Sequence, residues 1–126
     1  MRTYFIKRYN SFKFAFRGIS SAVRSEPHVR LHLLSVVLVV IAGFALGVTK
    51  TEWCLLIGCA GLVITAEVFN TAIETLTNLV SPDWHHLAGK TKDLAAGAVL
   101  VASVTAAVVG AIIFIPYLIA LAALYV

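Results

Sequence analysis

The chain has 126 residues, of which 60% are hydrophobic and 13% are charged, and its formal net charge is +4. Soluble domains hold about 45–50% apolar and about 25% charged residues, and the mean hydropathy here is +0.94. These values exclude a soluble globular protein and predict a single integral-membrane domain over residues 1–126.

The first predicted element is an amphipathic helix over residues 4–24. Apolar side chains recur there at steps of four and three, and basic side chains flank the apolar stripe. Segments of this kind lie in the membrane interface with the apolar face toward the lipid; an ordinary soluble amphipathic helix is the alternative. Ser25-Glu26-Pro27 ends the helix, because proline disfavours helical geometry in the residue before it.

Three apolar segments follow, and each is long enough to cross a bilayer as a helix: residues 31–48, 53–80 and 94–116. The second has 28 residues and predicts a helix of about 42 Å, against a hydrocarbon core of about 30 Å. If Trp53 marks the outer interface, Glu67 lies in the inner leaflet and Glu74 at or beyond the cytoplasmic boundary. Thr91 is the expected N-cap of the third segment.

Small residues recur at helical spacing in two of these segments. The spacing lets membrane helices approach closely, so we expect the thin three-span bundle to associate with further copies. The small residues are Ala98, Ala102, Ala106 and Gly110 in one segment and Gly58, Gly61 and Thr65 in another.

The basic residues are distributed unevenly. Seven of the ten Lys and Arg residues lie between Arg2 and Arg30, and two more lie in the 81–93 connection. Short loops rich in Lys and Arg stay in the cytoplasm, so the N-terminal arm and the 81–93 connection are predicted inside and the 49–52 turn outside. No nucleic-acid motif accompanies the basic arm, so its expected partner is the anionic bilayer surface and not a nucleic acid.

Four polar side chains form a ladder inside the second apolar segment. Glu67, Asn70, Glu74 and Asn78 are spaced so that they share one face of a helix. A carboxylate at bilayer depth costs about 2.5–3.5 kcal/mol on insertion scales. The ladder therefore indicates a functional site, with a polar seam that holds membrane helices together as the alternative.

Further polar residues on the predicted cytoplasmic side extend this ladder into a candidate site. Carboxylates near a basic group suit a magnesium–phosphate site, because hard oxygen ligands hold the metal and lysine offsets phosphate charge. A carboxylate that is partly removed from water suits a general base, since burial raises its proton affinity. The set is Glu26, Glu67, Asn70, Glu74, Lys92 and Asp93.

The motif Glu67-x-x-Asn70-Thr-Ala-Ile-Glu74, followed by Lys92-Asp93-x-Ala-Ala-Gly-Ala, resembles the small prokaryotic diacylglycerol kinase and undecaprenol kinase family. The Glu26–His32 segment and Thr51-Glu52-Trp53 fit the same pattern, so the resemblance covers nearly the whole chain. It implies an all-α membrane protein: a homotrimer whose subunits have an interfacial helix and three transmembrane helices. It also implies phosphoryl transfer from Mg-ATP to a lipid hydroxyl at composite sites in the bacterial cytoplasmic (inner) membrane.

The resemblance also implies roles for individual residues. Glu67 would be the catalytic base, Asn70 would orient groups beside it, and Glu26 and Glu74 would hold Mg²⁺ against the ATP phosphates. Further nucleotide contacts would come from Lys7, Phe14, Asp83, Trp84, His85, Lys92 and Asp93.

Two departures from the family pattern concern Asn78, where aspartate is usual, and Pro27-His28 after Glu26. Arg30-x-His32, the Thr-Glu-Trp turn and Phe114-Ile115-Pro116 resemble the undecaprenol kinase branch more than the diacylglycerol kinase branch. Undecaprenol is therefore the expected acceptor, with diacylglycerol as the alternative. A non-enzymatic proton-coupled transporter or channel subunit that titrates Glu67 is the alternative from another class.

Overall fold

The computed structural model describes residues 1–124, with the side chains of Arg2 and Thr3 excepted. It consists of four helices: α1 (Arg2–Ser25), α2 (Pro27–Leu46), α3 (Lys50–Val80) and α4 (His86–Ala122). The helices α2, α3 and α4 are long and apolar enough to cross a membrane. The expected all-α membrane fold with an amphipathic arm and three spans is confirmed.

The helices run beyond the apolar segments that the sequence marks. The helix α4 begins at His86 and not at Leu94, with His85 as its N-cap, so the expected cap at Thr91 is wrong. Instead, the Thr91 hydroxyl donates to the carbonyl of Leu87 inside the helix. The helix also continues through Pro116 to Ala122. Hydropathy detects the part of a helix that faces lipid and misses the polar turns that extend beyond it.

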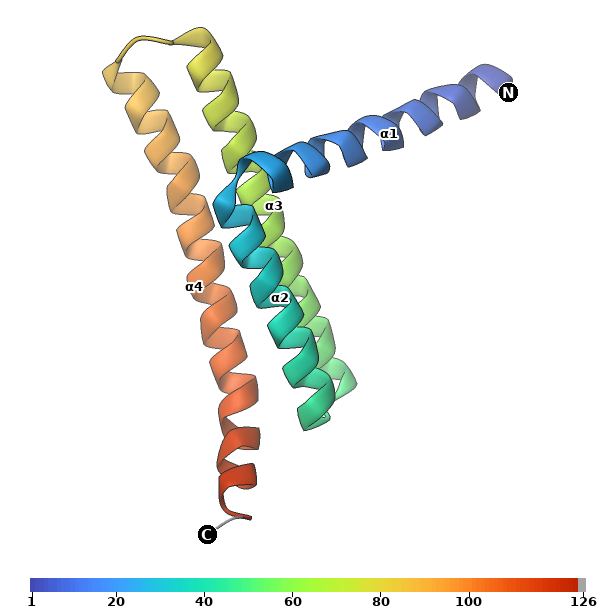
Figure 1. Cartoon of the computed structure of the whole chain (residues 1–126), viewed down its shortest axis with the longest axis vertical. Coiled ribbons are helices and arrows are strands. Elements are labelled where there is room, and N and C mark those ends of the chain that lie inside the picture. Colours follow the sequence, from blue (N-terminus) through green and yellow to red (C-terminus); the bar gives the residue numbers. More distant parts are fainter. Residues whose placement is uncertain (125–126) are drawn as a thin grey trace.

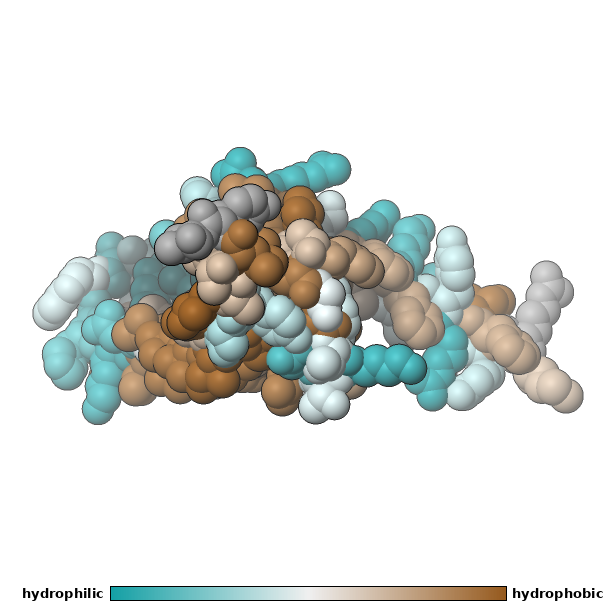
Figure 2. Space-filling view, turned by 90° about the horizontal axis from the view of Figure 1, so that it is seen from below, coloured by the Kyte–Doolittle hydropathy of each residue, from teal (hydrophilic) through white to brown (hydrophobic). Residues whose placement is uncertain are grey.

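The three long helices lie side by side, and α1 leads away from them (Figure 1). Glu26 ends α1 with extended backbone dihedrals, and Pro27 begins α2, as the sequence predicts. The elbow between α1 and α2 packs against the bundle through Ala22 and Val29, which are both buried. Figure 2 shows apolar side chains over much of the bundle, whereas the arm alternates between apolar and polar ones.

The bundle has two different ends, which we call the loop end (residues 81–85) and the turn end (residues 47–49). With 31 and 37 residues, α3 and α4 are about 46 and 55 Å long, whereas the 20 residues of α2 span about 30 Å. The last turns of α3 and the first turns of α4 therefore extend past the elbow at the loop end (Figure 1). A polar segment of two helices thus projects beyond the part that is long enough to fill a bilayer.

The main hydrophobic cluster lies toward the turn end. Val48, Leu56 and Ile113 are buried there, and Trp53 and Tyr117 pack against them. Gly47 ends α2 with a φ of +68°, a left-handed conformation that glycine adopts without a steric penalty. This end therefore holds α2, α3 and α4 together through apolar packing.

Candidate active site

Glu67 is the one buried polar side chain of the described residues, with 5% of its surface exposed. It lies in the middle of α3, after the apolar run of residues 54–66 and at the start of the polar ladder. One carboxylate oxygen, Oε1, lies 3.0 Å from Nε2 of His32 on α2. A carboxylate is therefore held away from water with a single basic partner.

The other members of the polar ladder become more exposed toward the loop end. Asn70 and Glu74 are half-buried, and Asn78 is exposed. The Asn70 amide donates to Oε1 of Glu74, one helical turn further along, over 3.1 Å. Asn70 therefore orients Glu74, whereas the sequence predicts that it orients groups beside Glu67. The carbonyl oxygen of Asn70 is buried and has no partner among the described residues.

Lys92 is brought to the ladder from the neighbouring helix. Its Nζ donates to Oδ1 of Asn78 over 2.6 Å and joins α4 to α3 close to the loop end. Asn78 is neutral, so it orients the lysine without cancelling its charge. Lys92 is therefore available as a positive group at the loop end of the ladder, one helical turn beyond Glu74.

The remaining residues predicted to contact the nucleotide are exposed. Asp83, Trp84 and His85 lie on the loop end and Asp93 on the first turns of α4, while Lys7 and Phe14 lie on α1. Most of α1 is distant from the loop end in Figure 1. One chain therefore places the loop-end residues together but does not bring Lys7 and Phe14 to them.

The predicted metal ligands come from separate elements. Glu26 is half-buried at the elbow and makes no capping hydrogen bond, while Glu74 lies on α3. Residues 1–124 contain no group of three His, Cys, Asp or Glu side chains that could hold a metal ion. Mg²⁺ commonly takes one or two carboxylates together with substrate phosphates and water. The donor chemistry of Glu74 and Glu26 fits that cation, with the remaining ligands coming from a nucleotide.

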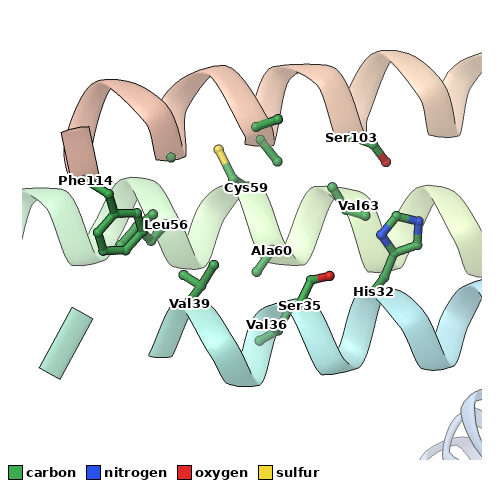
Figure 3. Close-up of a pocket in the computed structure, with 13 residues that line it drawn as sticks. His32, Ser35, Val36, Val39, Leu56, Cys59, Ala60, Val63, Ser103 and Phe114 are labelled. Atoms are coloured by element: carbon green, nitrogen blue, oxygen red, sulfur yellow. The ribbon is translucent and has the colours of Figure 1, made fainter. Parts of the chain in front are cut away.

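A cleft of about 320 Å³ runs along the face where α2, α3 and α4 meet. Its lining is mostly apolar, from Phe114 and Leu56 at one end to His32 and Ser103 at the other (Figure 3). The hydroxyl of Ser103 is buried and has no hydrogen-bond partner among the described residues. The cleft thus joins an apolar channel to the polar residue that contacts Glu67.

Sequence reasoning missed the contact between His32 and Glu67, and it missed Ser103. The sequence connects His32 with the family and branch patterns but not with Glu67, although a histidine at the start of a span is itself an expensive residue in lipid. Ser103 is a polar residue in a stretch without charges, and nothing in its spacing connects it with Glu67.

Comparison with known proteins identifies relatives over most of the chain. The family model of the prokaryotic diacylglycerol kinases matches residues 13–114. An undecaprenol kinase of Bacillus subtilis (strain 168) is 36% identical over 110 residues, which cover 87% of this chain and 89% of that protein. A diacylglycerol kinase of Synechocystis sp. is 36% identical over 88% of this chain and 64% of its own length. A diacylglycerol kinase of Haemophilus influenzae is 32% identical over 83% of this chain and 90% of its own.

Proposed function

The chain belongs to the prokaryotic diacylglycerol kinase family, and we propose that it transfers the γ-phosphoryl group of ATP to the hydroxyl of a membrane lipid alcohol, with undecaprenol as the acceptor. The observation that carries the proposal is the buried carboxylate of Glu67, which contacts His32 in the second turn of α2, near the elbow. The names of the relatives are those of lipid kinases, which removes the support for a non-enzymatic transporter or channel subunit.

Glu67 is the proposed general base. In the transfer, the acceptor hydroxyl attacks the γ-phosphorus, its proton passes to the carboxylate, and the bond from phosphorus to the oxygen that bridges to ADP breaks. Because the transition state is loose, the protein's main contributions are positioning and charge stabilisation. A base near headgroup depth can meet an alcohol whose hydrocarbon stays in the membrane.

The loop end is the proposed nucleotide site. Lys92, oriented by Asn78, offsets phosphate charge, and Glu74, oriented by Asn70, is a metal ligand together with Glu26. When bound, Mg²⁺ neutralises charge on the phosphate oxygens. Asp83, Trp84 and His85 of the loop end and Asp93 of α4 are exposed and are proposed to contact the nucleotide.

We further propose a homotrimer with composite sites between subunits. In one chain Glu26, Lys7 and Phe14 do not join the loop-end residues, and a neighbouring copy can supply them. Gly58, Gly61 and Thr65 are exposed on α3, with open space around both glycines, so this face is available to another copy. Mixed assemblies of Glu26→Gln and Glu67→Gln subunits should recover part of the activity that each variant lacks; no recovery at any mixing ratio would contradict shared sites.

The proposed location is the inner membrane, with the N-terminus and the loop end in the cytoplasm, where ATP is available. The distribution of Lys and Arg supports this orientation. Undecaprenol is favoured over diacylglycerol because the B. subtilis relative, matched over 89% of its length, is named an undecaprenol kinase.

Radiolabelled ATP with the purified protein tests the function. The protein is supplied in detergent micelles with undecaprenol or with diacylglycerol at equal mole fraction, and labelled lipid is measured. We expect label in both lipids and a higher kcat/KM with undecaprenol. A higher kcat/KM with diacylglycerol would reverse the acceptor assignment, and no labelled lipid with either alcohol would contradict the kinase.

A further inference from the structure

His32 on α2 and Glu67 on α3 are in direct contact, and both side chains are largely shielded from solvent. The His32 side chain is 22% exposed and that of Glu67 is 6% exposed, with 3.0 Å between Nε2 and Oε1. Among the side chains that the structure describes, this is the one contact between a basic and an acidic group at ion-pair distance. The contact therefore joins α2 to the residue on which the proposed chemistry depends.

No other described side chain orients the Glu67 carboxylate. In the middle of α3 the backbone N–H groups are used by the helix itself, so none is available to hold a carboxylate. The neighbouring polar groups on α3 are engaged elsewhere: the Thr71 hydroxyl donates to the backbone carbonyl of Glu67, and the Asn70 amide donates to Glu74. The orientation of the base is thus left to His32.

We propose that His32 is a positioning residue for Glu67: its Nε2 holds Oε1 of the carboxylate and leaves Oε2 to accept the proton of the lipid alcohol. The inference rests on the proposed function of Glu67 as general base. Burial removes the water that would otherwise solvate the carboxylate, so a partner is needed to keep it in one orientation. His32 also lines the end of the apolar cleft, which places it next to space that a bound alcohol can enter.

The test compares three substitutions in the full-length protein, with turnover and both KM values measured under the labelled-lipid assay. His32→Ala should lower kcat about a hundredfold, the cost of a base displaced by about 1 Å, while the KM for ATP stays within about twofold. His32→Gln should recover at least about tenfold of this loss, because the amide nitrogen of glutamine can reach the position of Nε2. Thr105→Ala is the control: Thr105 is exposed on α4, does not line the cleft, and its hydroxyl donates to the Val101 carbonyl and not to Glu67.

A fourth variant separates positioning from a structural role. In a Glu67→Gln background, His32→Ala should lower the residual rate by less than about threefold, because a residue that acts through Glu67 has nothing left to orient. A full hundredfold loss in that background would overturn the inference, as would His32→Gln behaving no better than His32→Ala, or His32→Ala behaving like Thr105→Ala.

Folding and function can be distinguished in the same set. His32→Ala leaves a buried carboxylate without its partner and can lose stability for that reason, but the double variant removes this cost. If Glu67→Gln folds and the double variant does not, His32 supports the fold independently of Glu67, and the inference fails. If the wild-type protein itself labels no lipid, it is the proposed function that has failed and not the role of His32.

Discussion

Two carboxylates of α3, one at the turn end and one in the middle of the helix, are held in opposite ways. At the turn end, Oε2 of Glu52 accepts from the backbone N–H and the hydroxyl of Thr49, over 2.7 and 2.8 Å, and from the Tyr117 hydroxyl over 2.9 Å. Glu67, toward the loop end, is buried and contacts only the imidazole of His32 among the described residues.

The difference extends to the surroundings of each carboxylate. Glu52 completes a capping box and ties α4 to the start of α3, beside the main hydrophobic cluster. By contrast, the buried oxygens of Asn70, one turn from Glu67, and of Ser103, at the His32 end of the cleft, have no hydrogen-bond partner among the described residues. Polar groups whose bonds are complete stabilise a fold, whereas buried groups with unused bonding capacity are free to bind a substrate. We therefore propose that the turn end serves stability and that the part of the bundle from Glu67 to the loop end serves chemistry, and four substitutions test that division.

The largest effect is expected from Glu67→Gln, which removes the proposed base and keeps the shape of the side chain. We expect kcat to fall by about 10²–10⁴-fold, the usual contribution of general-base catalysis, with nucleotide binding retained. Calorimetric titration with a non-hydrolysable ATP analogue and the labelled-lipid assay measure the two quantities. The matched control is Glu52→Gln, which should lower thermal stability but leave the turnover of folded protein near normal; equal loss of turnover in both variants would contradict the division.

Glu74→Gln should mainly weaken the binding of Mg-ATP. A carboxylate contributes charge to a metal–phosphate site, and a charged interaction of about 1.5–3 kcal/mol corresponds to roughly a tenfold to a hundredfold rise in the KM for ATP. Raising the Mg²⁺ concentration should recover part of the loss. A KM for ATP that does not change, at any Mg²⁺ concentration, would remove Glu74 from the metal site.

Gly43→Ala is a prediction about the turn end alone. A Cβ atom at this position would lie 2.8 Å from two ring atoms of Trp53, so the ring must shift in a packed region. We expect a loss of about 1–3 kcal/mol in stability, seen as a lower midpoint of thermal inactivation, with kcat of the folded protein unchanged. Gly18→Ala is the control, because its added methyl group meets open space on α1; equal destabilisation by both would show that the contact with Trp53 is unimportant.

The smallest effect is expected from Tyr117→Phe, which removes one of the three donors to Glu52 and keeps the ring in the hydrophobic cluster. The expected cost is about 0.5–1.5 kcal/mol, again without a change in kcat. Thermal inactivation in detergent measures it. A large fall in turnover with unchanged stability would mean that the turn end takes part in catalysis.

Much of the architecture could be predicted from local patterns. The apolar segments and the helix break at Glu26-Pro27 are determined by residues that are adjacent in the sequence, so they can be recognised without knowing the tertiary packing. The start of α4 could not be read in this way, because residues 86–93 are polar and resemble a loop, although they continue a helix that extends past the bilayer. The capping preference of Thr91 was overridden by the bonding of His85 with the N–H of Leu87.

The candidate site could be predicted only in part. The spacing of Glu67, Asn70 and Glu74 places them on one helix face whatever the neighbours are. The contacts of His32 with Glu67 and of Lys92 with Asn78 join different helices, so they depend on how α2, α3 and α4 are packed. Helical periodicity relates residues within one helix and cannot predict such contacts. Asn78 illustrates the limit: the sequence shows only that it departs from the usual aspartate, whereas the structure shows that its Oδ1 accepts a hydrogen bond from Lys92 over 2.6 Å.

The most direct test of the proposed mechanism is an experimental structure of the full-length protein in a lipid bilayer, with Mg²⁺ and a non-hydrolysable ATP analogue. We expect the triphosphate at the loop end, the metal on Glu74 and on Glu26 of a neighbouring subunit, and the free oxygen of Glu67 directed toward the γ-phosphate with His32 on its other oxygen. A triphosphate bound elsewhere, or Glu67 directed into bulk lipid far from Glu74, would contradict the mechanism.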